Sequence, residues 1–160
     1  MATKIQLKVG DKAPEFELPT NTGKSVSLKD LKGKSIVLYF YPKDATPGCT
    51  IEARDFSANV KKFREHNCEV IGVSKDSIKS HCSFADKQEL TILLGSDEKS
   101  DVCEKYGVWT EKNFIGKKYM GINRSTFLID KLGIIRKIWR SVGVNGHALE
   151  VLEELKMLGR

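Results

Sequence analysis

One long apolar run stands out early in the chain, and shorter ones follow it. Residues 35–41 read Ser-Ile-Val-Leu-Tyr-Phe-Tyr, without the alternation of a half-exposed strand, and Pro42 ends the run. Such a run is typical of a central strand buried on both faces. We expect two further strands, at residues 68–74 and, shorter, at residues 91–94.

Between and after these runs, apolar residues recur at helical spacing. The first predicted helix runs from about residue 50 to 65, and its apolar face would hold Ala53, Phe56, Val60 and Phe63. The second follows Asp76 and Ser77, which can cap its N-terminus, and runs to about Gln88. The other two predicted helices are residues 97–106, closed by Gly107, and residues 146–158.

The two ends of the pattern complete a fold prediction. Residues 11–19 are cut by prolines and read as an edge or irregular segment, and a turn at 21–24 precedes a short strand at 25–28. Residues 125–129 and 133–139 read as an antiparallel hairpin. The resulting β-α-β-α-β order with a final hairpin and helix predicts an α/β protein of thioredoxin-like fold, with helices on both faces of a mixed sheet.

Length and charge narrow the choice of function. The 160 residues contain no linker or repeat, so we expect a single domain over residues 1–160. The net charge is +6, but lysines are mixed with acidic residues along the chain, so we do not expect nucleic-acid binding. No apolar run approaches the roughly 18 residues of a membrane span, and residues 1–6 lack the apolar stretch of a signal peptide. We therefore expect a cytoplasmic protein that does not use a membrane.

The four cysteines point to thiol chemistry at one position. They form no CxxC pair and have no histidine at zinc-finger spacing, so neither a metal nor another cofactor is expected. Cys49 follows the buried strand and a proline-containing loop, at the first turn of a predicted helix. Unpaired N–H groups and partial positive charge at a helix N-terminus stabilise a thiolate, which is the nucleophilic form of the side chain. The alternative is a buried, unreactive cysteine.

Longer motifs resemble a known family. Residues 39–50, YFYPKDATPGCT, resemble the P-x-x-x-T-x-x-C peroxidatic motif of the peroxiredoxins, and the flanking pattern is similar to their bacterioferritin-comigratory, or PrxQ, subgroup. Further stretches agree in order across nearly the whole chain: GDKAPEF at 10–16, FADK at 84–87, CEKYGVW at 103–109 and RSTFLID at 124–130. The resemblance implies a thiol peroxidase for hydrogen peroxide and organic hydroperoxides, recycled by thioredoxin or a similar dithiol protein.

The same resemblance assigns roles to four residues. Cys49 would be the peroxidatic cysteine, and the Thr46 hydroxyl would hydrogen-bond the peroxide and the thiolate. Pro42 would shield the sulfur from water. Arg124 would hold the thiolate ionised and bind the peroxide oxygens, a task for which a permanently charged guanidinium with several donors is suited. Glu52 lies in the first helical turn, where the family has a polar or acidic residue near the active-site network, and we expect no direct role for it.

The chain departs from the family at the resolving step. Many PrxQ-like proteins carry a second cysteine five residues after the first, and here that position is Arg54. Cys82 is the candidate resolving cysteine, because some PrxQ-like proteins place theirs on the corresponding helix. The face of that helix directed at the core would hold Ile78, Phe84, Ala85 and Gln88, which leaves Cys82 on the flank. We expect Cys68 and Cys103 to serve in packing.

The sequence leaves other functions open. A one-cysteine peroxidase would take its resolving thiol from another molecule. A dithiol oxidoreductase of the thioredoxin type would need the CxxC that is absent, and a non-catalytic binding or holdase module could share the scaffold. Since no long cysteine-bearing arm follows the last predicted helix, we expect a monomer.

Overall fold

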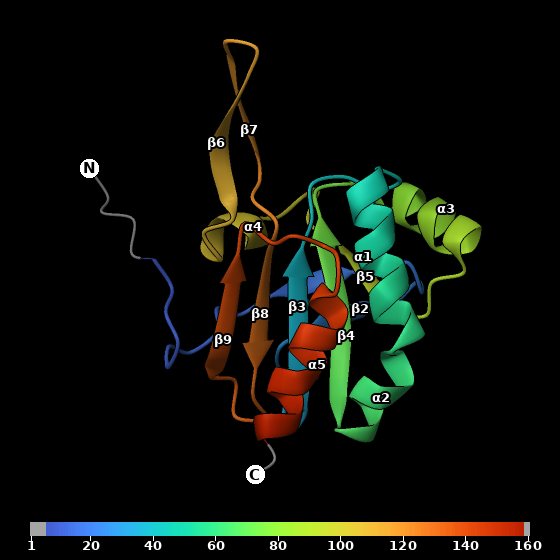
Figure 1. Cartoon of the computed structure of the whole chain (residues 1–160), viewed down its shortest axis with the longest axis vertical. Helices are drawn as coiled ribbons and strands as arrows, with labels where there is room; N and C mark the ends of the chain where they lie inside the picture. Colours follow the sequence, from blue (N-terminus) through green and yellow to red (C-terminus); the bar gives the residue numbers. More distant parts are fainter. Residues whose placement is uncertain (1–5, 159–160) are drawn as a thin grey trace.

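A five-stranded mixed sheet forms the centre of the computed structural model, which describes residues 6–158. The strand order is β5-β4-β3-β8-β9, with β3, β4 and β5 parallel and β8 and β9 antiparallel to their neighbours. The bounds are β3 Ser35–Phe40, β4 Cys68–Ser74, β5 Leu93–Ser96, β8 Ser125–Ile129 and β9 Ile135–Arg140. This arrangement, flanked by helices (Figure 1), confirms the predicted α/β class. The expectation that residues 1–6 form no signal peptide concerns residues that lie mostly, at 1–5, outside the described part of the chain.

The remaining elements surround this sheet. The helices are α1 Pro47–Ala58, α2 Val60–Glu65, α3 Ile78–Gln88, α4 Val102–Lys105 and α5 His147–Leu158. Two small antiparallel pairs lie outside the main sheet: β1 Glu17–Pro19 with β2 Ser25–Ser27, and β6 Trp109–Phe114 with β7 Lys117–Ile122.

The central strand β3 divides the core into two layers. Its side chains alternate, so Val37 and Tyr39 pack with α1, α2, α3 and α5, while Ile36, Leu38 and Phe40 pack on the other side against the N-terminal segment and α4. Every residue from Ile36 to Phe40 is at most 1% exposed. A strand covered on both faces explains the continuous apolar run in the sequence.

Several predicted boundaries were wrong. The helix expected at 50–65 is two helices that meet at Asn59, whose side-chain amide donates to the Asp55 carbonyl oxygen at 2.8 Å. The helix expected at 97–106 is only the short α4, because the buried Asp97 carboxylate accepts the backbone N–H groups of Val102 and Cys103 and holds the preceding residues as a loop. The strand expected at 91–94 lies two residues later, as β5.

The β6–β7 hairpin was not predicted at all. It projects from one end of the molecule (Figure 1), and nearly all of its side chains are exposed or half-buried, so the sequence carries no apolar alternation to reveal it. Its turn places Ile115 and Gly116 at φ values of 51° and 73°. Glycine suits this left-handed geometry, whereas a β-branched isoleucine is an unusual choice for it.

Candidate active site

Cys49 lies in the first turn of α1, directly after the loop that leaves β3. Thr46 is the N-cap residue and Pro47 opens the helix, where its missing N–H costs no hydrogen bond. The Cys49 side chain is only 1% exposed and belongs to the apolar layer beneath α1. The thiol is therefore held at a helix N-terminus and away from bulk water.

Arg124 brings a positive charge to this sulfur. It lies in the short link between β7 and β8, 75 residues from Cys49 in sequence, and its Nη2 donates to Cys49 Sγ at 3.3 Å. A Cβ atom at Gly48 would lie 3.2 Å from the same nitrogen, so a glycine beside the cysteine leaves room for the guanidinium. Burial disfavours the charge of Arg124, but Glu52 and Cys49 outweigh it and raise its pKa.

Glu52 completes the group through Arg124, at the position where the resemblance implies a polar or acidic residue near the active-site network. One turn after Cys49, it is 1% exposed and accepts from Arg124 Nη1 at 2.6 Å. Burial raises the pKa of Glu52 to about 7, and Arg124 limits the rise. Its second oxygen, Oε2, is buried and has no hydrogen-bond partner among the described residues. The acid thus holds Arg124 from one side while the sulfur faces it from the other.

Thr46 and Pro42, to which the resemblance assigns roles, lie in the loop before Cys49. The Thr46 hydroxyl donates to the Lys43 carbonyl oxygen at 2.8 Å, so its single proton is not directed at Cys49 in this structure. Pro42 is exposed, yet Cys49 is almost inaccessible.

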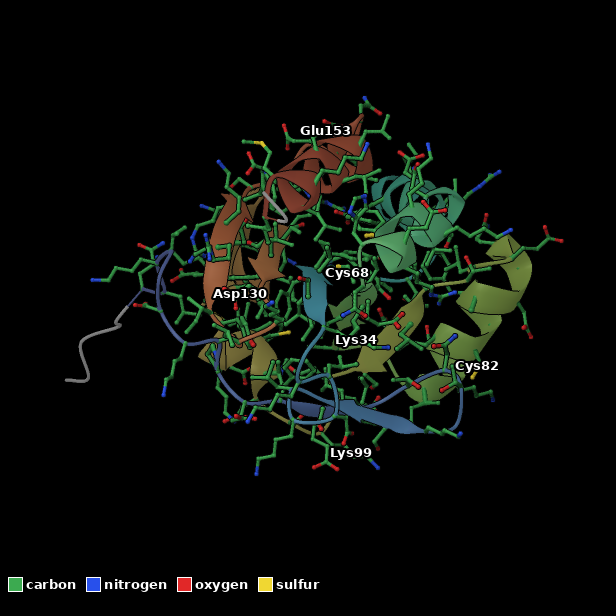
Figure 2. All side chains as sticks on the ribbon, turned by 90° about the horizontal axis from the view of Figure 1, so that it is seen from below. Lys34, Cys68, Cys82, Lys99, Asp130 and Glu153 are labelled. Atoms are coloured by element: carbon green, nitrogen blue, oxygen red, sulfur yellow. The ribbon has the colours of Figure 1, made fainter. Side chains whose placement is uncertain are left out.

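All four cysteines are free thiols in the structure, in different surroundings. Cys68 and Cys103 are 2% and 0% exposed, and burial raises the pKa of both, to about 12 for Cys68, as expected of packing residues. Cys82 is half-buried on α3, and its thiol donates to the Asn21 carbonyl oxygen at 3.4 Å. Figure 2 places Cys82 at the outer edge of the molecule and Cys68 near the sheet.

The flank position of Cys82 follows from α3, although one residue of the predicted core face was misplaced. Phe84 and Ala85 are buried and Gln88 is half-buried, but Ile78 is 40% exposed, because it opens the helix directly after the N-cap. The predicted cap is present: the Ser77 hydroxyl accepts the Ser80 backbone N–H at 3.1 Å.

A second polar cluster, which sequence reasoning missed, lies beside the Cys49 loop. Asp44, Asp76 and His81 have ligand-type atoms within 4.8 Å of one another, a spacing that could in principle hold a metal ion. These atoms are instead hydrogen-bonded among themselves and to neighbouring hydroxyl groups. The cluster therefore fits a hydrogen-bonded network better than a metal site.

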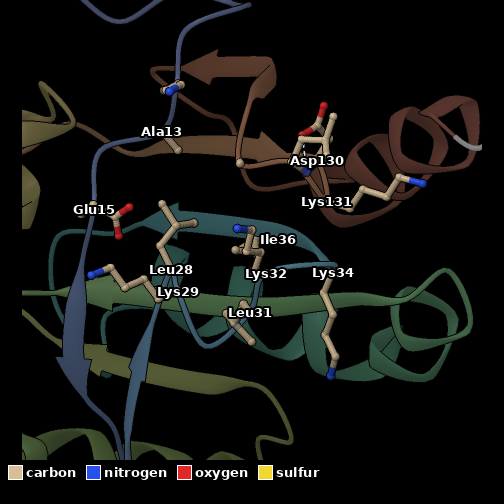
Figure 3. Close-up of a pocket in the computed structure, with 13 residues that line it drawn as sticks. Ala13, Glu15, Leu28, Lys29, Leu31, Lys32, Lys34, Ile36, Asp130 and Lys131 are labelled. Atoms are coloured by element: carbon tan, nitrogen blue, oxygen red, sulfur yellow. Dashed lines mark hydrogen bonds between the residues drawn. The ribbon is translucent and has the colours of Figure 1, made fainter.

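Lysines lie at two other places of interest: Lys112 on β6 and a surface hollow. Lys112 on β6 is half-buried, and burial, together with the charge of Arg124, lowers its pKa below the usual value. A hollow of about 340 Å³ is lined by five lysines and by the chain around Asp130. Figure 3 shows that Lys29, Lys34 and Lys131 point in different directions, so these three ammonium groups do not converge.

Comparison with known proteins identifies the family. Residues 9–138 match the AhpC/TSA family. The chain is 51% identical to a putative peroxiredoxin bcp of Coxiella burnetii over 94% of this chain and 100% of that one. It is 50% identical to peroxiredoxin Bcp of Bacillus subtilis over 95% and 97% of the two chains. The chain belongs to the AhpC/TSA family, as a peroxiredoxin of the Bcp/PrxQ type.

Solved structures of PrxQ-type peroxiredoxins are also similar to this chain. A cysteine-to-serine variant of Xylella fastidiosa PrxQ has a TM-score of 0.92 at 39% identity, over 98% of this chain and 99% of that one. The Xanthomonas campestris bacterioferritin comigratory protein, described as reducing alkyl peroxides, has a TM-score of 0.86 at 41% identity, over 91% and 92%. These neighbours confirm the thioredoxin-like fold, and the family makes this peroxiredoxin a thiol-dependent peroxidase. Among residues 6–158, no helix is long and apolar enough to cross a membrane.

Proposed function

We propose that this peroxiredoxin reduces hydrogen peroxide and organic hydroperoxides at Cys49 and is recycled by thioredoxin or a similar small dithiol protein. The observation that carries the proposal is the 3.3 Å contact between Arg124 Nη2 and Cys49 Sγ at a helix N-terminus. A permanent charge and several fixed donors stabilise negative charge on sulfur and on a departing oxygen. The alkyl peroxide activity of the Xanthomonas relative supports organic substrates.

The first step is a displacement at oxygen. The Cys49 thiolate attacks the terminal oxygen of ROOH, an S–O bond forms and the O–O bond breaks. The leaving RO⁻ takes up a proton as ROH, and Cys49 becomes a sulfenic acid. Arg124, held in place by Glu52 at 2.6 Å, faces the reacting sulfur throughout. In our proposal Thr46 and Pro42 line the entry once peroxide is bound, with the Thr46 hydroxyl turning from the Lys43 carbonyl oxygen to the peroxide.

The second step joins two cysteines of one chain. The Cys82 thiol attacks the Cys49 sulfenic acid, a disulfide forms and water leaves. A disulfide needs Cα atoms about 4.4–6.8 Å apart. Each sulfur here is engaged elsewhere, Cys49 with Arg124 and Cys82 with the Asn21 carbonyl oxygen, so α1 and α3 must open locally. A dithiol reductant then restores both thiols by exchange.

The proposal also covers the oligomeric state and the cellular compartment. An intramolecular disulfide needs no second copy, and we propose a monomer. Four unpaired cysteines suit a reducing compartment, and we propose the cytoplasm.

The test combines peroxide consumption with disulfide mapping. Wild type with thioredoxin and its reductase should consume both hydrogen peroxide and an alkyl hydroperoxide, while Cys49→Ser should consume neither and stay folded. Mass spectrometry after one equivalent of peroxide should find a monomeric Cys49–Cys82 disulfide. A stable Cys49 sulfenic acid without any protein disulfide would instead support the one-cysteine mechanism.

A further inference from the structure

The loop that carries the peroxidatic motif is tied to the helix that carries Cys82 by a buried pair. Asp44 lies in that loop, and His81 lies on α3 immediately before Cys82. His81 Nδ1 is 2.7 Å from Asp44 Oδ2, and the two side chains are 0% and 4% exposed. This contact links two segments 37 residues apart in sequence.

Both ring nitrogens of His81 face hydrogen-bond acceptors. His81 Nδ1 faces the Asp44 carboxylate, and Nε2 faces the Gly95 carbonyl oxygen at 3.0 Å. A neutral imidazole has one N–H and one acceptor nitrogen, so two acceptors opposite the ring require both nitrogens to donate. An imidazolium opposite the Asp44 carboxylate satisfies both contacts, and the two side chains are almost inaccessible to water.

The surroundings stabilise the carboxylate partner. Asp44 also accepts from the Tyr41 hydroxyl at 2.5 Å and from the Ser80 hydroxyl at 2.8 Å. Burial alone would raise the pKa of Asp44, but the hydrogen bonds from His81 and Tyr41 lower it below its usual value. The Asp44 backbone N–H donates to Asp76 at 2.8 Å, so the loop is held through main chain and side chain alike.

This pair is therefore in the path of the motion that resolution needs. If Cys82 leaves the Asn21 carbonyl oxygen to meet Cys49, the turn of α3 that contains His81 must move with it. That movement separates an imidazolium from its carboxylate, which is costly in a buried site.

We propose that the Asp44–His81 ion pair is a latch that positions the Cys49 loop for peroxide attack and controls how readily Cys82 reaches the oxidised sulfur. The inference rests on the proposed resolving role of Cys82. Opening of the latch competes with a second peroxide, which would carry the sulfenic acid on to sulfinic acid. The strength of the pair thus sets the balance between disulfide formation and over-oxidation.

The test compares wild type with His81→Gln and Asp44→Asn, which keep size and polarity but remove the ion pair. Tyr106→Phe is the matched control, because it removes a buried hydrogen bond, to the Pro14 carbonyl oxygen, in the other core layer. Quench-flow mass spectrometry would follow the sulfenic acid, the Cys49–Cys82 disulfide and the sulfinic acid. Hydrogen exchange without peroxide would report opening of residues 42–50 and 78–88.

In both latch variants, the two segments should exchange faster together and the disulfide should form about 10-fold faster or more. The peroxide concentration that over-oxidises half the enzyme should rise, and sulfenic acid formation should slow. Tyr106→Phe should change none of these. Exchange and partition equal to the control would overturn the latch. If exchange accelerates but no variant forms the Cys49–Cys82 disulfide, the latch stands as a structural pair and its role in resolution fails with the proposed role of Cys82.

Discussion

Cys49 and Cys82 are the same side chain in two opposite settings. Cys49 is 1% exposed at a helix N-terminus, with the Arg124 guanidinium 3.3 Å from its sulfur. Cys82 lies half-buried within α3, and its thiol has only a weak hydrogen bond to a carbonyl oxygen. A carbonyl oxygen does not favour a thiolate, whereas a guanidinium does. In our proposal, this difference suits Cys49 to the attack on peroxide and Cys82 to the resolving step.

Removing the positive charge of Arg124 beside Cys49 should have the largest effect. Arg124→Ala should lower the second-order rate of peroxide reduction by about 10²–10³, the usual loss for one donor that stabilises transition-state charge. Stopped-flow kinetics with hydrogen peroxide would measure it. Arg136→Ala is the control, since Arg136 is half-exposed and pairs with Asp130 on the surface. An unchanged rate in Arg124→Ala would show that another group activates the thiol.

Removing the second thiol should affect a different step. Cys82→Ser should form the first sulfenic acid at the wild-type rate, but steady-state turnover with thioredoxin should fall about 10-fold or more and sulfinic acid should accumulate. Coupled turnover and mass spectrometry would separate the two effects. Cys103→Ala is the control, because that thiol is fully buried. Wild-type turnover in Cys82→Ser would mean that an external thiol or Cys103 resolves the sulfenic acid.

The raised pKa of Glu52, which pairs with Arg124, can be tested through the pH dependence of stability. Since its pKa in the folded protein is about 7, above that of an unfolded glutamate, folding takes up a proton between about pH 4.5 and 7. The free energy of unfolding should therefore fall as pH rises through this window, on the order of 2 kcal/mol more in wild type than in Glu52→Gln. Urea unfolding at pH 5 and pH 8 would measure this. Glu153→Gln, at an exposed site, should follow wild type; parallel curves for Glu52→Gln would contradict the assignment.

The smallest effect is expected far from both thiols. Ile115→Asn, at the tip of the β6–β7 hairpin, should raise the free energy of unfolding by about 0.5–1 kcal/mol, because asparagine tolerates the left-handed φ of 51° better than isoleucine. Thermal unfolding would detect this, and peroxidase kinetics should not change. A lower stability would show that the exposed isoleucine side chain makes a stabilising contact.

Local patterns in the sequence were sufficient to predict several features of the structure. The apolar run at 35–40 specified a strand covered on both faces, and Ser77 specified the start of α3. The peroxidatic motif singled out Cys49, and the resemblance singled out Arg124, the two residues that the structure brings together. The strand and cap predictions succeeded because strand burial and helix caps depend on residues close together in the chain or on strongly patterned segments.

The polar pairings could not be predicted, because they depend on how distant segments pack. The sequence around Asp97 does not show that its side chain accepts the N–H groups of later residues and so delays the start of the helix. Likewise, the sequence around Glu52 or Asp44 does not show a buried partner 72 or 37 residues away. The exposed β6–β7 hairpin was equally hidden, because it buries too little apolar surface to leave a pattern. Charged side chains read as solvated from sequence, and only the packing of strands and helices shows which of them must be paired because water is excluded.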